Sequence, residues 1–339
     1  MDIIMIESKK LERSQRVSAR LLSLMPPLHT LPPKIFRPIF LMMDRMLGLG
    51  KTQMHEINEY LVPATYVKPD DNEESKKIRI RAYYPTEIPT PSKQDNTHEQ
   101  RSLVFFHGGG CVIGSIETHD RFCRYLAKHS NMIIISVDYR LAPEHKFPAP
   151  VCDAIDAWNW INHHHKQLKL HPRHIGVGGD SAGGYLACII GQSSLQHTLT
   201  VQSNYLPSFQ FLLYPMLSLV GNTHSYEKFN KHLILTNKLM DYFINHFLNS
   251  LSERHLPLAS PVLNEIIKTD IKTYILTLGF DPLRDDGIAY AKRLKQAEAE
   301  IVHEHFPDCM HAFISVTSIS KRAKEATHAV AMALEKFNH

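Results

Sequence analysis

The sequence predicts an α/β protein whose mainly parallel sheet is covered by helices on both faces. Short, continuously apolar runs alternate with longer helix-forming stretches from about residue 102 to the C-terminus. Strands without polar alternation are buried on both faces, which is typical of parallel sheets joined by helical crossovers. The chain has 339 residues, of which 43% are hydrophobic and 21% charged, so it is globular and long enough to bury such a sheet.

The N-terminal region is predicted to be helical. Residues 7–25 are basic and helix-permissive, and Pro26-Pro27 ends the run. Apolar residues recur in it at helical spacing, namely Val17, Leu21 and Leu24. A second helix is expected near residues 34–47. Its predicted apolar face comprises Ile35, Phe36, Ile39, Phe40, Met43, Met46 and Leu47.

Three interpretations of these N-terminal helices are open. The second helix either packs on its own core or forms a lid whose Phe and Met side chains line an acyl pocket. The basic residues of the first helix also allow contact with a membrane surface. These residues are Lys9, Lys10, Arg13, Arg16 and Arg20.

Eight strands are expected. Two β-rich runs at 60–68 and 78–84 flank a charged turn, as in an antiparallel hairpin, and a Pro-, Thr- and Gln-rich surface loop follows at 85–101. The other six strands are expected at 102–106, 132–138, 174–178, 209–213, 272–278 and 301–306. The helices of this region are expected near 118–130, 151–166, 182–196, 285–298 and 319–337.

One interval breaks the alternation of strands and helices. Between Pro215 and Pro261 no strand is predicted, but Thr236 is placed to cap a helix running to about Asn249. Its predicted apolar face comprises Leu239, Phe243 and Phe247. We expect this segment to leave the sheet and to lie over the same strand ends as the N-terminal helices.

Residues 174–191 combine a short apolar strand, a glycine-flanked turn and a helix of small and apolar residues. The turn Gly179-Asp180-Ser181-Ala182-Gly183 fits Gly-x-Ser-x-Gly, which exposes a serine hydroxyl between a strand and a helix. Glycines there avoid collisions in a strained turn, and the helix N-terminus supplies amides and a positive dipole end for an oxyanion. For the pentapeptide alone, a small-residue turn without chemistry stays an alternative.

A nucleophilic serine needs a base and an acid that orients the base, in the chain order Ser, Asp or Glu, His for this type of sheet. Asp281 follows directly on the strand that ends near Gly279, and His311 follows the next strand. Both lie at strand C-terminal ends, where such sheets build their sites. Asp285 is a rival for Asp281, which is preferred because it lies closer to the strand end. His311 is one of 22 histidines and is selected by its position alone.

A glycine triplet, Gly108-Gly109-Gly110, follows His107 and the predicted strand at 102–106. Successive glycines let backbone amides approach a substrate oxygen closely. A flexible loop is the usual meaning of such a triplet. After a buried strand and ahead of a serine turn, however, an oxyanion hole is the better interpretation.

Together these elements resemble the bacterial hormone-sensitive-lipase family (family IV) of α/β-hydrolase esterases, from about residue 60 to the C-terminus. The matching motifs are His107–Gly110, Val137–His145 with Phe147-Pro148, Gly179–Gly184, Asp281–Asp285 and His311–Phe313. The resemblance implies an α/β-hydrolase fold, with an eight-stranded, mostly parallel sheet, helices on both faces and a helical cap. The implied cap segments are 1–55 and 216–255, and the implied core segments are 56–215 and 256–339.

The resemblance also implies the roles of the site residues. Ser181 would be the nucleophile, His311 the general acid and base, and Asp281 the carboxylate that orients it. The amides of three residues would form the oxyanion hole, on a loop that also includes His107 and Gly108. These three residues are Gly109, Gly110 and Ala182.

Several positions depart from the family pattern or have another expected role. Ala312 stands where the family usually has glycine, and Tyr185 replaces a common asparagine. Both differences affect the expected pocket shape more than the chemistry. A structural role, bracing loops near the oxyanion strand, is expected for three charged residues of the Val137–His145 motif: Asp138, Arg140 and Glu144.

The implied activity is hydrolysis of short- to medium-chain carboxylic esters through an acyl-enzyme. Hydrolysis of longer acylglycerols, and amidase or deacetylase activity on the same scaffold, stay open because they use the same groups. A non-enzymatic receptor of this fold would be expected to have lost one of Ser181, Asp281 and His311, all of which are present.

Composition and charge limit the partners. A formal charge of +4 without long one-sign blocks predicts no nucleic-acid partner, and no metal or other cofactor is expected. The five scattered cysteines are expected to be reduced and mostly buried. Residues 1–10 do not fit a signal peptide and no apolar span reaches eighteen residues, so a cytoplasmic location is expected. Peripheral membrane contact and a homodimer stay open.

Overall fold

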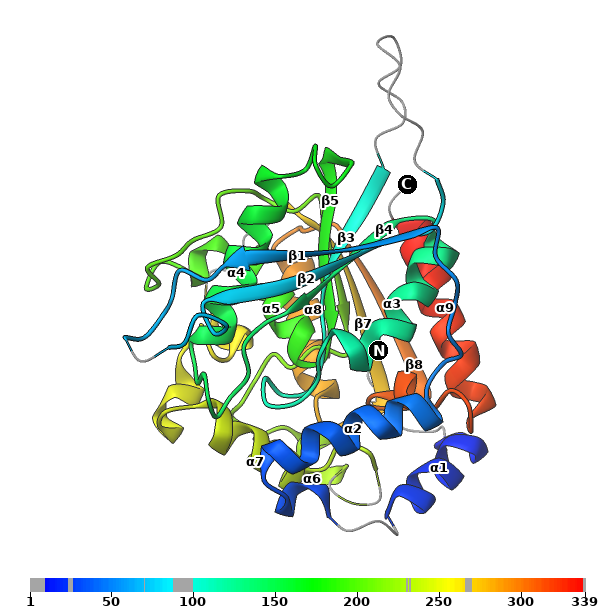
Figure 1. Cartoon of the computed structure of the whole chain (residues 1–339). Coiled ribbons are helices and arrows are strands. Elements are labelled where there is room, and N and C mark those ends of the chain that lie inside the picture. The colour runs from blue at the N-terminus through cyan, green and yellow to red at the C-terminus, as the bar shows by residue number, and fades with distance from the viewer. Residues whose placement is uncertain are drawn as a thin grey trace.

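One eight-stranded sheet organises the chain (Figure 1). The structure is a computed structural model and describes residues 10–23, 27–69, 71–87, 100–229, 231, 233–265 and 270–337. The strands are β1 (Glu56–Pro63), β2 (Lys77–Tyr84), β3 (Gln100–Phe106), β4 (Ile133–Asp138), β5 (Leu170–Asp180), β6 (Phe209–Leu213), β7 (Lys272–Phe280) and β8 (Ile301–Met310). They lie in the order β1-β2-β4-β3-β5-β6-β7-β8. β2 pairs antiparallel with β1 and β4 and the other neighbours are parallel, which confirms the predicted fold class.

Helices cover both faces of the sheet. They are α1 (Arg13–Ser23), α2 (Pro33–Leu47), α3 (Ile116–Ser130), α4 (Ala149–His163), α5 (Ala182–Gly191), α6 (His224–Lys228), α7 (Asn237–Phe247), α8 (Arg284–Gln296) and α9 (Lys321–Phe337). α3 and α9 lie on one face, and α4, α5 and α8 lie on the other (Figure 1). Successive side chains of β3 point to opposite faces of the sheet. Leu103 and Phe105 pack with α3 and α9, whereas Val104 and Phe106 pack with α4 and α5.

The parallel strands bring distant parts of the chain to one edge of the sheet. β3 ends at Phe106, directly before the glycine loop, and β5 ends at Asp180, directly before Ser181. β7 and β8 likewise end at the residues that precede Asp281 and His311. Because the carboxyl ends of parallel strands share one edge, all four connections meet there. Figure 1 shows α1, α2, α6 and α7 gathered at this end of the sheet.

Several predicted boundaries are wrong. β5 and β8 are longer than the strands expected at 174–178 and 301–306, and α4 ends at His163 rather than at residue 166. The first strand was expected at 60–68 but spans 56–63, because it pairs along the whole of β2, with Glu56 opposite Tyr84 and Pro63 opposite Lys77. Only one of its side chains is buried, so apolarity marks the strand weakly. The helix expected to reach residue 196 ends at Gly191, and a short 3₁₀ turn follows. In the loop expected at 85–101, residues 88–99 lie outside the described residues and residues 100–101 belong to β3.

The apolar residues spaced along the first helix do not form its buried face. Val17 and Leu21 of α1 are 49% and 54% exposed, and Leu24 lies outside the described residues. Among residues 13–21 of α1 the buried ones are Gln15, Ser18 and Ala19. Gln15 accepts a hydrogen bond from the amide of Met310 at 2.8 Å, so α1 packs partly through polar contacts that hydrophobic periodicity does not reveal.

The apolar face predicted for α2 is too wide. Ile35 and Met46 are 50% and 67% exposed. Phe36 is buried and contacts the rings of Phe40 and of Tyr242 on α7. α2 therefore presents a narrower stripe to the protein and leaves apolar side chains at its outer surface.

The helix predicted in the strand-free interval is confirmed. Thr236 caps α7 by accepting a hydrogen bond from the amide of Leu239 at 3.3 Å. The helix ends at Phe247, two residues before the expected end at Asn249. In the described part of the chain no helix has the length and apolarity needed to cross a membrane. The five cysteines are buried and unpaired, as expected.

Candidate active site

Ser181 lies at the sharp turn between β5 and α5. Its backbone has φ 53° and ψ −117°, a conformation that residues other than glycine rarely adopt. The neighbours explain why this turn needs glycines. A Cβ at Gly179 would lie 2.4 Å from the carbonyl oxygen of Phe106, and a Cβ at Gly183 would lie 1.8 Å from the same atom. Only glycine fits at these two positions. The close packing of β3 against the turn therefore maintains the strained conformation of Ser181.

Three polar side chains meet at this turn. The Ser181 Oγ lies 2.9 Å from His311 Nε2, and His311 Nδ1 lies 2.8 Å from Asp281 Oδ2. His311 and Asp281 are 4% and 1% exposed. The amide of Leu283 donates to the other oxygen of Asp281 at 2.8 Å. The buried carboxylate fixes the proton of the imidazole on Nδ1, which leaves Nε2 able to accept the serine proton.

The rival carboxylate has other partners. Asp285 accepts hydrogen bonds from the amide of Ser225 at 2.7 Å and from Arg284 at 2.8 Å. It therefore ties α8 to α6, while Asp281 is the carboxylate bonded to His311. The preference for the residue nearer the strand end agrees with this geometry.

The glycine loop follows β3 and presents free amides. Gly109 and Gly110 have φ of 118° and 62°, and in the described part of the chain their amides donate to no protein acceptor. A Cβ at Gly109 would lie 2.2 Å from the carbonyl oxygen of Ile113, and one at Gly110 would lie 2.3 Å from the ring of Phe243. The amide of Ala182, the first residue of α5, has no preceding helical carbonyl to bond. The loop and the helix start therefore offer unpaired donors beside Ser181.

A buried ion pair between Asp180 and His119 contacts the start of the glycine loop. The amide of Gly108 donates to Asp180 at 2.8 Å, and His119 on α3 lies 3.2 Å from the same carboxylate oxygen. Although burial opposes the charged form, the Asp180 carboxylate raises the pKa of His119. The hydroxyl of Tyr139 donates to the carbonyl of His107 at 2.6 Å, and the two rings stack. These contacts fix the start of the loop, and sequence patterns gave no signal for the pairing of Asp180 with His119.

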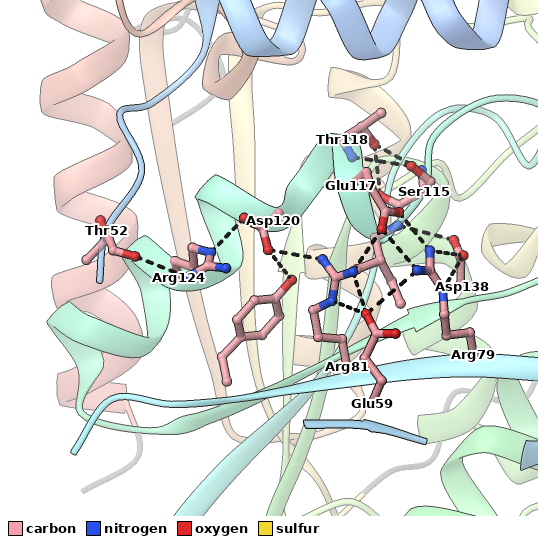
Figure 2. Close-up of polar contacts among 12 residues, drawn as sticks. Thr52, Glu59, Arg79, Arg81, Ser115, Glu117, Thr118, Asp120, Arg124 and Asp138 are labelled. Atoms are coloured by element: carbon pink, nitrogen blue, oxygen red, sulfur yellow. Dashed lines mark hydrogen bonds and ion pairs between the residues drawn. The ribbon is translucent and has the colours of Figure 1, made fainter. Parts of the chain in front are cut away.

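Ion pairs hold the far end of the loop (Figure 2). Asp138 accepts from the amide of Ile116 at the start of α3 and also binds Arg79 of β2 at 2.8 Å. Arg79 in turn binds Glu117 of α3 at 2.7 Å, as does the neighbouring Arg81 at 2.8 Å. The chain that leaves the glycine loop is thus anchored to β2 and β4.

The other two charged residues of this motif also have structural contacts. Arg140 binds the fully buried Asp153 at 2.6 Å and donates to the carbonyl of Tyr66. Glu144 binds Arg37 of α2 at 2.7 Å. The structural roles expected for Asp138, Arg140 and Glu144 are therefore confirmed.

An apolar cavity of about 100 Å³ lies beside Ser181 and His311. α2 and the region of α7 supply much of its wall. Lining residues from these two segments include Phe36, Phe40, Met43, Leu47, Leu235, Leu239 and Phe243. Two carboxylates, Asp44 of α2 and Asp180 of β5, also line the cavity. The helices outside the sheet therefore cover the reacting groups with mostly apolar side chains.

Two contacts of the N-terminal helices were not predicted from the sequence. Arg37 of α2 donates to the carbonyls of Val112 at 2.9 Å and Ala142 at 2.8 Å, next to the glycine loop. Gln15 of α1 bonds the chain at Met310, the residue before His311. A single arginine or glutamine on a helix carries no signal of such long-range contacts.

The two departures from the family pattern have structural explanations. Ala312 has φ 56° and ψ 31°, the left-handed conformation in which glycine is favoured. The alanine therefore stores strain next to His311. Tyr185 is fully buried, donates to the carbonyl of Leu258 at 2.9 Å and contacts the ring of Phe247. It fills space between α5 and α7.

Comparison with known proteins agrees with this architecture. A family model described as the α/β-hydrolase fold matches residues 103–315. The carboxylic ester hydrolase LipN of Mycobacterium tuberculosis is 34% identical over 234 residues, which cover 68% of this chain and 62% of LipN. Ethyl acetate hydrolase of Pseudomonas putida is 31% identical, over 74% of this chain and 78% of that protein. The chain thus spans less than two thirds of LipN but more of the second relative.

A solved structure extends the likeness to nearly the whole chain. The esterase of Pyrobaculum calidifontis superposes with a TM-score of 0.81 and 30% sequence identity, over 96% of this chain and 98% of that one. Residues 103–315, which the family model matches, contain the glycine loop, the serine turn, Asp281 and His311. The chain belongs to the α/β-hydrolase-fold family, within its hormone-sensitive-lipase (family IV) group of carboxylesterases.

Proposed function

We propose that the protein is a serine hydrolase that cleaves short- to medium-chain carboxylic esters through an acyl-enzyme. The observation that carries the proposal is the unbroken chain of contacts from Asp281 through His311 to Ser181, at 2.8 and 2.9 Å, which ends in an apolar cavity. A serine hydroxyl bonded to an oriented imidazole is the arrangement that nucleophilic acyl transfer needs.

The first half of the reaction acylates Ser181. His311 Nε2 takes the serine proton while Oγ bonds to the ester carbonyl carbon, and Asp281 stabilises the imidazolium that forms. The carbonyl oxygen becomes an oxyanion that accepts hydrogen bonds from the amides of Gly109, Gly110 and Ala182. The intermediate collapses with cleavage of the bond to the alcohol oxygen, which receives its proton from His311.

The second half releases the acid. His311 takes a proton from a water molecule, whose oxygen attacks the acyl carbon, and the same three amides stabilise the second oxyanion. Collapse of this intermediate breaks the bond to Ser181 Oγ, which regains its proton from His311. Every proton that moves is carried by one imidazole, so the chain's own residues supply all the required groups.

The cavity supports small apolar ester groups as substrates. Its volume of about 100 Å³ is smaller than the roughly 300–1,000 Å³ of pockets that hold drug-sized ligands, so little space is open beside Ser181 when the cap helices are seated. Ethyl acetate, named for the Pseudomonas putida relative, is an ester of this size class. Longer acyl groups require α2 or α7 to move, which is the lid function that we assign to the cap segments 1–55 and 216–255.

A second candidate is a lipase acting on longer acylglycerols at a lipid surface. The observation in its favour is the outer surface of the cap, where Val17 and Leu21 of α1 and Met42 and Met46 of α2 are about half exposed or more. Apolar and basic side chains on one surface are typical of helices that lie on membranes. Emulsified long-chain triacylglycerol, compared with dissolved short esters, separates the two substrates.

Ser181→Ala tests the proposal. We expect the purified variant to keep the melting temperature of the wild type and to lose hydrolysis of nitrophenyl butyrate, because the nucleophile is gone. A nitrophenyl ester series of increasing acyl length then defines the preferred substrate of the wild type. Butyrate hydrolysis that persists in Ser181→Ala would contradict the proposal, and a corresponding nitroanilide tests amidase activity.

A further inference from the structure

The cavity beside Ser181 is mostly apolar, and one of its lining carboxylates has an unpaired oxygen. Its polar lining side chains are Asp44, His119, Asp180, Ser181, His311 and Ser315. Asp44 of α2 lines it and is only 9% exposed. In the described part of the chain its Oδ2 is buried and has no hydrogen-bond partner. Buried polar groups are nearly always bonded, so an unpaired carboxylate oxygen in a substrate cavity needs an explanation.

Three other buried carboxylates in the protein are bonded. Asp153 binds Arg140, Asp180 binds His119 and the amide of Gly108, and Asp281 binds His311. Asp44 differs from these three in having an unpaired oxygen, Oδ2, while its side chain lines the cavity. A substrate group in that cavity is therefore available to supply the missing hydrogen bond.

The surroundings of Asp44 do not neutralise it. The charged and titratable groups around it are Arg45 on its own helix and His119, Asp120 and Arg121 on α3. His119 already bonds Asp180 through Nε2 and Thr118 through Nδ1, so neither ring nitrogen is free for Asp44. Burial raises the pKa of Asp44 to about 6, although His119 and Arg121 favour the charged form. The carboxyl is thus mostly ionised at neutral pH and accepts hydrogen bonds.

We propose that Asp44 is a specificity-determining residue that accepts a hydrogen bond from the substrate. The preferred substrates are esters that carry a hydroxyl or a protonated amine at a distance from the reacting carbonyl. This rests on the ester hydrolase function proposed above, and it adds the substrate class. A site built to bond a polar group rejects the analogue that lacks it, because the buried acceptor is then left unpaired.

Matched esters test the proposal. The series comprises butyl hexanoate and counterparts with a hydroxyl or an amine at the end of either the alcohol or the acyl chain, assayed titrimetrically at constant pH. For the donor position that reaches Asp44, we expect the wild type to have a kcat/KM about tenfold above that of the plain ester. The comparison within one enzyme cancels any effect of pH that all the esters share.

Two substitutions at position 44 separate the contribution of the carboxylate charge from that of the hydrogen-bond acceptor. Asp44→Leu should abolish the preference, raise kcat/KM for butyl hexanoate and raise the melting temperature, because a buried unpaired carboxylate is replaced by an apolar side chain. Asp44→Asn keeps a carbonyl oxygen, so it should retain part of the preference for the hydroxyl and lose that for the amine. The control is Asp241→Asn on α7, an exposed carboxylate outside the cavity, which should leave all ratios at their wild-type values.

The pH dependence gives a further readout. Protonation of Asp44 below its pKa of about 6 removes the charge, so the preference for the amine-bearing ester should fall as the pH drops from 8 to 5 in the wild type. The preference should not change with pH in Asp44→Leu. A wild type without preference at any donor position, or a preference that survives in Asp44→Leu, would overturn the inference. Failure of the wild type to hydrolyse any ester would instead overturn the proposed function.

Discussion

Replacement of Gly109 by alanine should abolish most of the activity without unfolding the protein. Gly109 has φ 118°, which an alanine adopts only with strain, and the added Cβ would lie 2.2 Å from the carbonyl oxygen of Ile113. That oxygen is backbone, so the loop must shift and the amide of residue 109 must turn away. Loss of one oxyanion donor costs about 3 kcal/mol, which corresponds to about a hundredfold lower kcat.

The assay is steady-state hydrolysis of nitrophenyl butyrate, with KM expected to change little because the donor acts mainly in the transition state. Gly50→Ala is the matched control, since a Cβ there meets no atom within 4 Å. Circular dichroism checks that both variants are folded. A kcat for Gly109→Ala within threefold of the wild type would refute the assignment of this amide to the oxyanion hole.

Three other substitutions test the surroundings of His311. Asp281→Asn should lower kcat by about four orders of magnitude, because the imidazole loses the partner that fixes its tautomer, whereas Asp285→Asn should keep kcat within about threefold; equal losses in the two variants would count against Asp281. Ala312→Gly should stabilise the protein by up to about 1 kcal/mol, measured by urea unfolding, because glycine adopts φ 56° without strain. A less stable Ala312→Gly variant would show that the left-handed conformation is not strained.

The sheet and the neighbourhood of the site were predictable for physical reasons. Continuous apolar strands identify a parallel sheet, and parallel strands end at one edge, so residues that follow β5, β7 and β8 had to lie near one another. Ser181, Asp281 and His311 each follow such a strand. The sequence also identified the N-terminal capping residue of α7, because Thr236 directly precedes apolar residues at helical spacing.

The helices outside the sheet were predicted less well because their packing is long-range and partly polar. Val17 and Leu21 recur at helical spacing but are exposed, whereas Gln15 of α1 bonds the chain at Met310. The contacts of Arg37 with the glycine loop join residues 75 and 105 positions apart, which no local pattern reveals. The unpaired state of Asp44 is likewise visible only once the surrounding helices are in place.

The hydrogen bonds of Arg37 affect which mutations can broaden the range of substrates. Its guanidinium donates hydrogen bonds from α2 to the carbonyls of Val112 and Ala142, and it also forms an ion pair with Glu144. Any swing of α2 that widens the entrance must either break these bonds or pull on the segment that positions the oxyanion donors. Mutations that broaden substrate acceptance by loosening α2 will therefore tend to slow the chemical step, and a variant library selected for bulky esters should recover both properties together only when Arg37 is kept.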